Sequence, residues 1–354
     1  MNVNRIGLVL CSSTAQPIPS TRVAVINMLP FLRSAGLQTC LLFESAQPSE
    51  TPDLTGVALR ALEAGCQVVI LQKVRGASAV ALARELSTAG VRTIYAVCDQ
   101  VDLSMVEATT GTVIVTEYLK SLCPAALHKR IHVVHDGIER PEACKSAWGS
   151  EAGSNRRPLR AVLVTSTGLD RLPVLGQPPD WLKVRIVGRY SHGFNRMREI
   201  RWTMAALRSD ERIDYLRFLV NRHIECVPWH PEGVYKEMVQ ADIAVIPIET
   251  PTEKSSASIP PAWMLKSENR LTLKMSMGLP VIATPIPSYE PLIEHGINGF
   301  FARTRHDWEV CLTALRDPDR RREMGLAARA SVTQRYSMQE QAGKLLRAIQ
   351  IEAT

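Results

Sequence analysis

The chain has 354 residues, of which 45% are hydrophobic and 22% charged, and 42 basic against 35 acidic residues leave a formal charge of +7. This length and composition are typical of a globular protein of about two domains, and they exclude a disordered chain, a low-complexity array and a disulfide-stapled miniprotein. No apolar run approaches the roughly 18–20 residues of a membrane-spanning helix, and the first residues do not resemble a secretory signal, so we expect a cytosolic protein.

The first half alternates apolar runs of strand length with segments of helix length. Helices are expected over 20–34, with a kink at Pro30, and over 77–87. The apolar runs are rich in Val, Ile and Leu, and several show no polar alternation, which is typical of parallel strands that helices cover on both faces. Six strands are expected in this half, at 6–11, 37–43, 67–71, 91–97, 112–115 and 131–134.

The pattern breaks over 139–158, where polar and small residues indicate a linker or surface loop. We therefore expect an α/β protein with parallel sheets in two Rossmann-like domains, 1–150 and 151–335, followed by a helix in 336–354. The second half repeats the alternation, with strands expected at 159–164, 184–187, 215–220, 243–246 and 281–283 and helices around 317–335 and 338–349.

The net positive charge favours anionic partners such as phosphorylated small molecules, nucleic acid or an acidic membrane surface. Only 5% of residues are aromatic, and none interleave with a basic run, so we expect no nucleic-acid partner. The charge allows peripheral association with the inner face of a membrane, although no basic amphipathic helix requires it. The eight cysteines form no CxxC pair, so neither structural zinc nor a disulfide framework is expected.

Phosphate-binding fingerprints of the GxGxxG and GxxxxGK[ST] types are absent from the sequence. Ligands of open parallel sheets bind beyond the carboxyl ends of the strands, so two facing domains would place a site in the cleft between them. Thr167 and Gly168 follow the strand at 159–164 and form either a polar turn or a loop for phosphate or sugar oxygens.

The most informative segment is 263–301. A helix is expected over 265–277, and Lys266, Asn269 and Arg270 then lie at i, i+3 and i+4 on one face near its start. A helix N-terminus carries partial positive charge and free N–H groups. The segment therefore predicts a diphosphate-binding site, with a solvated basic face as the alternative.

Three blocks of this half resemble a known family: ADIAVIPIET (241–250), KSENR (266–270) and GLPVIATPIPSYEPLIEHGINGFF (278–301). They are similar to the donor domain of GT-B glycosyltransferases, most of all to the family-4-like sequences called "glycosyl transferases group 1". The resemblance implies two facing Rossmann-like domains around a cleft, with a nucleotide-sugar donor on the second and an acceptor on the first. It also implies that the helix in 336–354 crosses back to the first domain.

The resemblance and the positions of polar residues at strand ends together name the candidate site. Donor-binding candidates are Lys266, Ser267, Asn269, Arg270, Tyr289, Glu290, Thr167, Gly168, Gly188 and Arg189. Arg22 and Lys73 are acceptor-binding candidates, or else ordinary surface cations. Asp99 and Asp102 are candidates for the base that takes the acceptor proton, with helix capping as the alternative for Asp99. The resemblance implies catalysis without a bound metal, and fixed cations are expected to stabilise the leaving diphosphate without a metal or another cofactor.

Two features depart from the family pattern. The family often carries a Glu-x7-Glu motif, whose positions here are Leu265 and Leu273, and a His-Asp pair where this chain has Cys98 and Asp99. The predicted function is the metal-independent transfer of a sugar from a nucleotide-sugar onto a glycan, lipid-linked or small-molecule acceptor. The alternatives are a non-catalytic nucleotide-sugar-binding or partner protein with the same fold, and a nucleotide-sugar epimerase.

Overall fold

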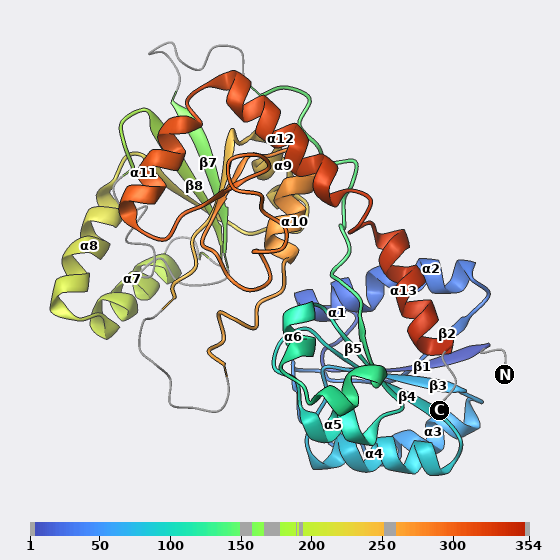
Figure 1. The fold of residues 1–354 in the computed structure, drawn as a ribbon. Helices are drawn as coiled ribbons and strands as arrows, with labels where there is room; N and C mark the ends of the chain where they lie inside the picture. Colours follow the sequence, from blue (N-terminus) through green and yellow to red (C-terminus); the bar gives the residue numbers. More distant parts are fainter. Residues whose placement is uncertain are drawn as a thin grey trace. The chain divides into compact units, whose positions relative to one another are not determined.

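The computed structural model describes residues 4–148, 158–165, 178–188, 190, 194–250 and 260–350. The chain forms two compact units, coloured by sequence in Figure 1. The first comprises Met1–Glu139, Ala257–Asn269 and Arg335–Thr354, and the second Arg140–Ser256 and Arg270–Gln334. Each unit is therefore assembled from segments that lie far apart in the sequence.

The first unit is built on a six-stranded parallel sheet with strand order β2-β1-β3-β4-β5-β6. Its strands are β1 (Arg5–Leu10), β2 (Gln38–Glu44), β3 (Val68–Gln72), β4 (Arg92–Val97), β5 (Gly111–Ile114) and β6 (Ile131–Val133). Each of the six strands predicted for this half is confirmed, with its ends within one residue of the expected positions. The apolar runs mark them well because the central strands are buried on both faces.

Alternate residues of these strands belong to two different hydrophobic clusters, because successive side chains of a strand point to opposite faces of the sheet. Val69 and Leu71 belong to one cluster, whereas Val68 and Ile70 belong to the other. The second cluster also contains Leu345 of the C-terminal helix, so this helix packs within the first unit.

The helix expected over 20–34 is instead divided into three pieces. It breaks at Val25, and Pro30 lies in the first turn of the following helix, where its missing N–H costs no hydrogen bond. The helices of this unit are α1 (Pro19–Ala24), η1 (Ile26–Met28), α2 (Leu29–Ser34), α3 (Val57–Glu63), α4 (Ala77–Thr88), α5 (Leu103–Ala108), α6 (Glu117–Ser121), η2 (Ala125–Arg130) and α13 (Met338–Gln350).

The second unit has its own six-stranded parallel sheet, with strand order β12-β11-β10-β7-β8-β9. Two six-stranded parallel sheets flanked by helices confirm the expected Rossmann-like α/β class. The strands are β7 (Leu159–Val164), β8 (Leu182–Gly188), β9 (Ile224–Pro228), β10 (Ile243–Ile246), β11 (Val281–Ala283) and β12 (Phe300–Phe301).

The strand predicted at 215–220 is wrong, because these residues form the end of helix α8. Tyr215 and Phe218 are buried three residues apart, while Leu216 and Val220 are 49% and 82% exposed, which is a helical spacing. The helices of this unit are α7 (Phe194–Ala206), α8 (Ser209–Val220), α9 (Gly233–Gln240), α10 (Asn269–Ser276), α11 (Arg305–Ala314) and α12 (Pro318–Val332).

The polar segment expected as a linker is partly built into the second unit. Lys145 donates from Nζ to the carbonyls of Val239 and Ala241, and the Nε1–H of Trp148 donates to the carbonyl of Gly278 at 2.7 Å. Residues 140–148 therefore pack through specific side chains that composition alone does not reveal. Within the described ranges, no helix is both long and apolar enough to cross a membrane.

Candidate functional site

Polar residues follow three strands at the carboxyl edge of the first sheet. Lys73 follows β3, Cys98 and Asp99 follow β4, and His135 and Asp136 follow β6. All six strands are parallel, so these ends share the edge at which ligands of such sheets bind. The candidate site in this unit is built from these turns.

Lys73 is held between two carboxylates. Its Nζ lies 2.6 Å from Asp99 Oδ2 and 3.1 Å from Glu50 Oε1, and its backbone has a φ of +55°. Burial lowers the pKa of Lys73, but the hydrogen bond and charge of Asp99 and the bond to Glu50 outweigh it, so that the pKa is raised overall. Lys73 is therefore a fixed cation of this edge. Its partner Asp99, the candidate base, has a side chain that is 42% exposed.

Asp102 is a helix cap. Its carboxylate accepts the backbone N–H of Ser104 at 2.9 Å, at the start of α5, and also the Ser104 hydroxyl. The sequence suggested helix capping as an alternative role for Asp99. In the structure the residue that caps a helix is Asp102, three positions later.

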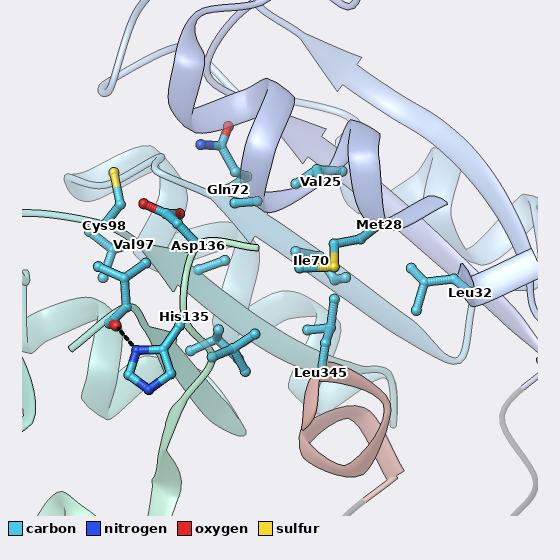
Figure 2. A pocket seen from close by; sticks show the side chains of 15 residues that line it. Val25, Met28, Leu32, Ile70, Gln72, Val97, Cys98, His135, Asp136 and Leu345 are labelled. Atoms are coloured by element: carbon cyan, nitrogen blue, oxygen red, sulfur yellow. Dashed lines mark hydrogen bonds between the residues drawn. The ribbon is translucent and has the colours of Figure 1, made fainter. Parts of the chain in front are cut away.

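A small pocket opens beside Asp136, with a cavity volume of about 30 Å³. Figure 2 shows the carboxyl of Asp136 and the thiol of Cys98 at one end, and Met28, Ile70 and Leu345 at the other. Burial raises the pKa of the Cys98 thiol, so this cysteine stays protonated. The pocket therefore presents hydrogen-bonding groups at its polar end and an apolar wall behind them.

Asp136 is the most perturbed acid of this edge. Only 8% of the residue is exposed, and burial, followed by the charge of Glu268, raises its pKa to about 7, against a hydrogen bond from Ser267 that lowers it. A carboxyl of this kind exchanges its proton near neutral pH and fits a functional site. The sequence analysis missed it, although an acid shortly after a predicted strand, the signal that selected Asp99, is present here as well.

His135 ties three distant segments to this edge. Its Nδ1 lies 2.5 Å from Glu268 Oε1 and 2.8 Å from the Val115 carbonyl, and its ring packs against Tyr336 at 4.8 Å between centroids. The backbone N–H of His135 donates to the side chain of Gln341 in α13 at 2.9 Å. His135 and Glu268 thereby fix the backbone that carries Asp136.

The KSENR segment differs from its prediction in one respect. Helix α10 begins at Asn269, so Lys266 precedes the helix and does not share a helical face with Asn269 and Arg270. The reason is tertiary: Glu268, only 1% exposed, is drawn to His135 within the first unit. Ser267 hydrogen-bonds Asp136, which places this predicted donor-binding residue beside the missed carboxylate.

Arg270 lies in the first turn of α10, in the second unit, and this turn contains no acidic residue. Helices usually place acids there, because the N-terminus carries partial positive charge. An added cation at this point leaves a positive helix end that suits an anion. Leu265 and Leu273 stand where the family often has carboxylates, and Leu265 packs in the core of the first unit.

The other donor candidates of the second unit lie near strand ends. Gly188 ends β8, and a Cβ added there would lie 3.2 Å from the Thr165 carbonyl, so a side chain would crowd this turn. Tyr289, after β11, is fully buried, whereas Glu290 is exposed and lies 3.9 Å from Arg303. Thr167, Gly168 and Arg189 lie outside the described residues.

Arg22, a predicted acceptor-binding residue, forms a bidentate ion pair with Glu139. Its Nε and Nη2 lie 2.7 and 3.1 Å from the two carboxylate oxygens of Glu139, which also accepts from Asn27 at 2.9 Å. This pairing is internal to the first unit. No group of three or more metal-ligating side chains occurs in the part of the chain that the structure describes.

Comparison with known proteins identifies the fold. No protein-family model matches the sequence, and no curated protein matches it. Among solved structures, sucrose-phosphate synthase from Thermosynechococcus elongatus is similar with a TM-score of 0.69 at 13% identity, over 97% of this chain and 98% of that one. A glycosyltransferase from Rickettsia africae gives 0.68 at 14% identity over 98% of both chains. Anabaena HepE in complex with UDP gives 0.66 at 11% identity over 97% and 98%.

These near-complete overlaps show that the chain has the fold of glycosyltransferases, and they confirm the GT-B architecture that the sequence resemblance implied.

Proposed function

We propose that this protein is a glycosyltransferase that moves a sugar from a nucleotide-sugar donor onto an acceptor hydroxyl. The structures with the same fold support the class, since they include a sucrose-phosphate synthase and HepE with bound UDP. We further propose a hexosyl group as the transferred sugar, because another structure of HepE contains UDP-glucose.

The observation that carries the proposal is the start of α10. Its first turn contains Arg270 and no acidic residue, and the first backbone N–H groups of a helix have no carbonyl partner within the helix. Transfer of a sugar leaves a nucleoside diphosphate whose negative charge grows as the glycosidic bond breaks. Fixed cations at a helix N-terminus stabilise that charge, and we propose that Arg270 does so here without a metal.

The acceptor is proposed to bind at the carboxyl edge of the first sheet. Lys73 and Asp136 supply hydrogen-bonding groups at this edge, and we propose that they recognise hydroxyls of a glycan, lipid-linked or small-molecule acceptor. Where a base is needed for the acceptor proton, we propose Asp99, whose side chain is 42% exposed. Asp102 is the weaker candidate, because its carboxylate caps helix α5.

The test begins with thermal shift against UDP-, GDP-, ADP- and dTDP-sugars, since a ligand that binds only the folded state raises the Tm. The donor so identified is then titrated into R270A, which we expect to bind at least tenfold more weakly. The matched control is R305A, which removes an exposed arginine of α11 that pairs with Glu309. Wild-type affinity in R270A would refute the proposed diphosphate site.

One observation favours a second candidate, a non-catalytic nucleotide-sugar-binding protein. Leu265 is buried in a hydrophobic cluster and supplies no carboxylate to a sugar. Incubating the donor with and without a broad acceptor panel separates the possibilities. Acceptor-dependent release of the nucleoside diphosphate supports transfer, an intact donor supports binding alone, and a changed sugar without any acceptor supports the epimerase alternative.

A further inference from the structure

Gln72 is a buried glutamine that the proposed function has not used. It is the last residue of β3, is 2% exposed, and lines the pocket beside Asp136. Its Oε1 accepts from the hydroxyl of Thr21 at 2.9 Å and from the backbone N–H of Cys11 at 3.4 Å. Its Nε2, with two N–H donors, has no hydrogen-bond partner among the residues that the structure describes. Buried donors are normally bonded, so this one calls for a partner from outside the chain.

A chain of donors behind Gln72 fixes the orientation of its amide. The backbone N–H of Cys11 can only donate, so it must face the amide oxygen. Thr21 accepts from the Ser12 hydroxyl at 2.8 Å, and Ser12 accepts from the N–H of Ile18 at 3.3 Å. A flipped amide would set its N–H groups against these donors. The Nε2 of Gln72 is therefore directed away from them, into the pocket.

Asp136 supplies an acceptor at the same end of the pocket, where Figure 2 shows its carboxyl and the amide of Gln72. An ionised carboxylate only accepts hydrogen bonds, and an amide nitrogen only donates them. A hydroxyl does both, so it accepts from Gln72 while it donates to Asp136. An anionic group would meet the charge of Asp136, and an ammonium would meet the N–H groups of Gln72. The pair therefore selects a neutral hydroxyl.

The rest of the pocket suits the carbon atom that carries such a hydroxyl. Its walls include Val25, Met28, Ile70 and Leu345, and its cavity volume is about 30 Å³. A water molecule needs roughly 10–15 Å³ of such space, so about two small groups fit. A hydroxymethyl group matches this size and this polarity, whereas a sugar ring would stay outside.

We propose that Gln72 is an acceptor-binding residue, and that Gln72 and Asp136 together hold an uncharged hydroxymethyl group of the acceptor in this pocket. The inference rests on the proposed function, because it assigns the pocket to the acceptor of that reaction. It narrows the acceptor to alcohols with a free hydroxymethyl group, such as many sugars and polyols. It excludes acceptors that carry a phosphate at that position.

The first experiment measures binding in the pocket without any transfer reaction. Ethanol, acetate and ethylammonium each have two carbons and end in a hydroxyl, an anion and a cation. Each is titrated into the ¹⁵N-labelled full chain at pH 8, at equal ionic strength, where Asp136, with a pKa of about 7, is mostly ionised. The side-chain NH₂ signal of Gln72, assigned by its absence in Q72M, is followed by NMR. The exposed Gln339 of α13 is the internal control for solvent effects.

The Gln72 signal should respond to ethanol at a concentration at least tenfold lower than to acetate or ethylammonium. The Gln339 signal should not distinguish the three probes. A Gln72 signal that ethanol does not move, or that all three move alike, would overturn the inference. The signal is observed in the wild type, so the result does not depend on the stability of Q72M.

The second experiment uses the acceptor that the panel of the proposed function identifies. Q72M should raise the KM for this acceptor at least threefold and leave the Kd for the donor unchanged, while Q339L should match the wild type. An unchanged KM in Q72M would overturn the role of Gln72 and leave glycosyl transfer standing. If ethanol binds at Gln72 but no acceptor is glycosylated, the proposed function fails, and with it the assignment of this pocket to an acceptor.

Discussion

The carboxyl of Asp136 should make the stability of the first unit depend on pH. Burial and the charge of Glu268 raise its pKa from 3.8 to about 7, so the folded protein keeps a proton between these values that the unfolded chain releases. The folded state is thus favoured at low pH, and this contribution is lost as the pH rises toward 7. A shift of roughly three units at about 1.4 kcal/mol each corresponds to about 4 kcal/mol.

D136N keeps the shape of the side chain and removes its charge, so the variant should retain that stability at pH 8. We expect the Tm of D136N to approach that of the wild type at pH 5 and to exceed it increasingly as the pH rises. The difference should reach on the order of 10 °C for a unit of 150–250 residues.

Circular dichroism melts of both proteins at half-unit steps from pH 5 to 8 provide the measurement. D99N is the matched control, since Asp99 also follows a strand of this sheet, β4, but has a side chain that is 42% exposed, and its curve should run parallel to that of the wild type. The reasoning fails if the D136N and wild-type curves are also parallel over this range.

Two further substitutions test packing outside the proposed chemistry. R22A leaves the carboxylate of Glu139 without its ion pair in a side chain that is 11% exposed, so we expect a loss of about 1–3 kcal/mol and a Tm lower by several degrees. R22K should restore part of it, and an unchanged Tm in R22A would show that the ion pair contributes nothing. G325A puts a Cβ 2.2 Å from the Gly278 carbonyl, so α12 must shift, and thermal melts should show at least about 2 kcal/mol of destabilisation. A Tm within 1 °C of wild type would contradict this close approach.

The strands of the first sheet were predictable because their signal is local. β3 is buried at every position, so its sequence is a continuous apolar run bounded by polar residues. The same rule fails at 215–220, where a short apolar run belongs to a helix whose other faces are exposed. Over six residues, periodicity in the sequence cannot distinguish a strand from a buried helix. The burial of Tyr215 and Phe218, three residues apart, identifies the helix.

Only those site residues that lie together in one segment of the sequence could be predicted. Arg270 could be selected from a short stretch, because a cation at a helix start follows from spacing alone. The cluster of His135, Asp136 and Glu268 could not, since Glu268 is 133 positions from His135 and a single sequence contains no record of which distant residues meet. The same contact explains why α10 starts later than expected: its tertiary pairing overrides a local pattern that favours helix.

Asp136 and Lys274 titrate in adjacent pH ranges and with opposite effects on stability. The contribution of Asp136 falls as the pH rises from 4 to 7, whereas the cost of burying Lys274 is lost only as the pH rises from about 7 toward 10.5. The two groups together therefore stabilise the protein least near pH 7, so D136N should flatten the fall in stability below pH 7 and K274M the rise above it. Thermal melts of both variants from pH 5 to 10 measure this, and a K274M curve parallel to that of the wild type above pH 7 would contradict the reasoning.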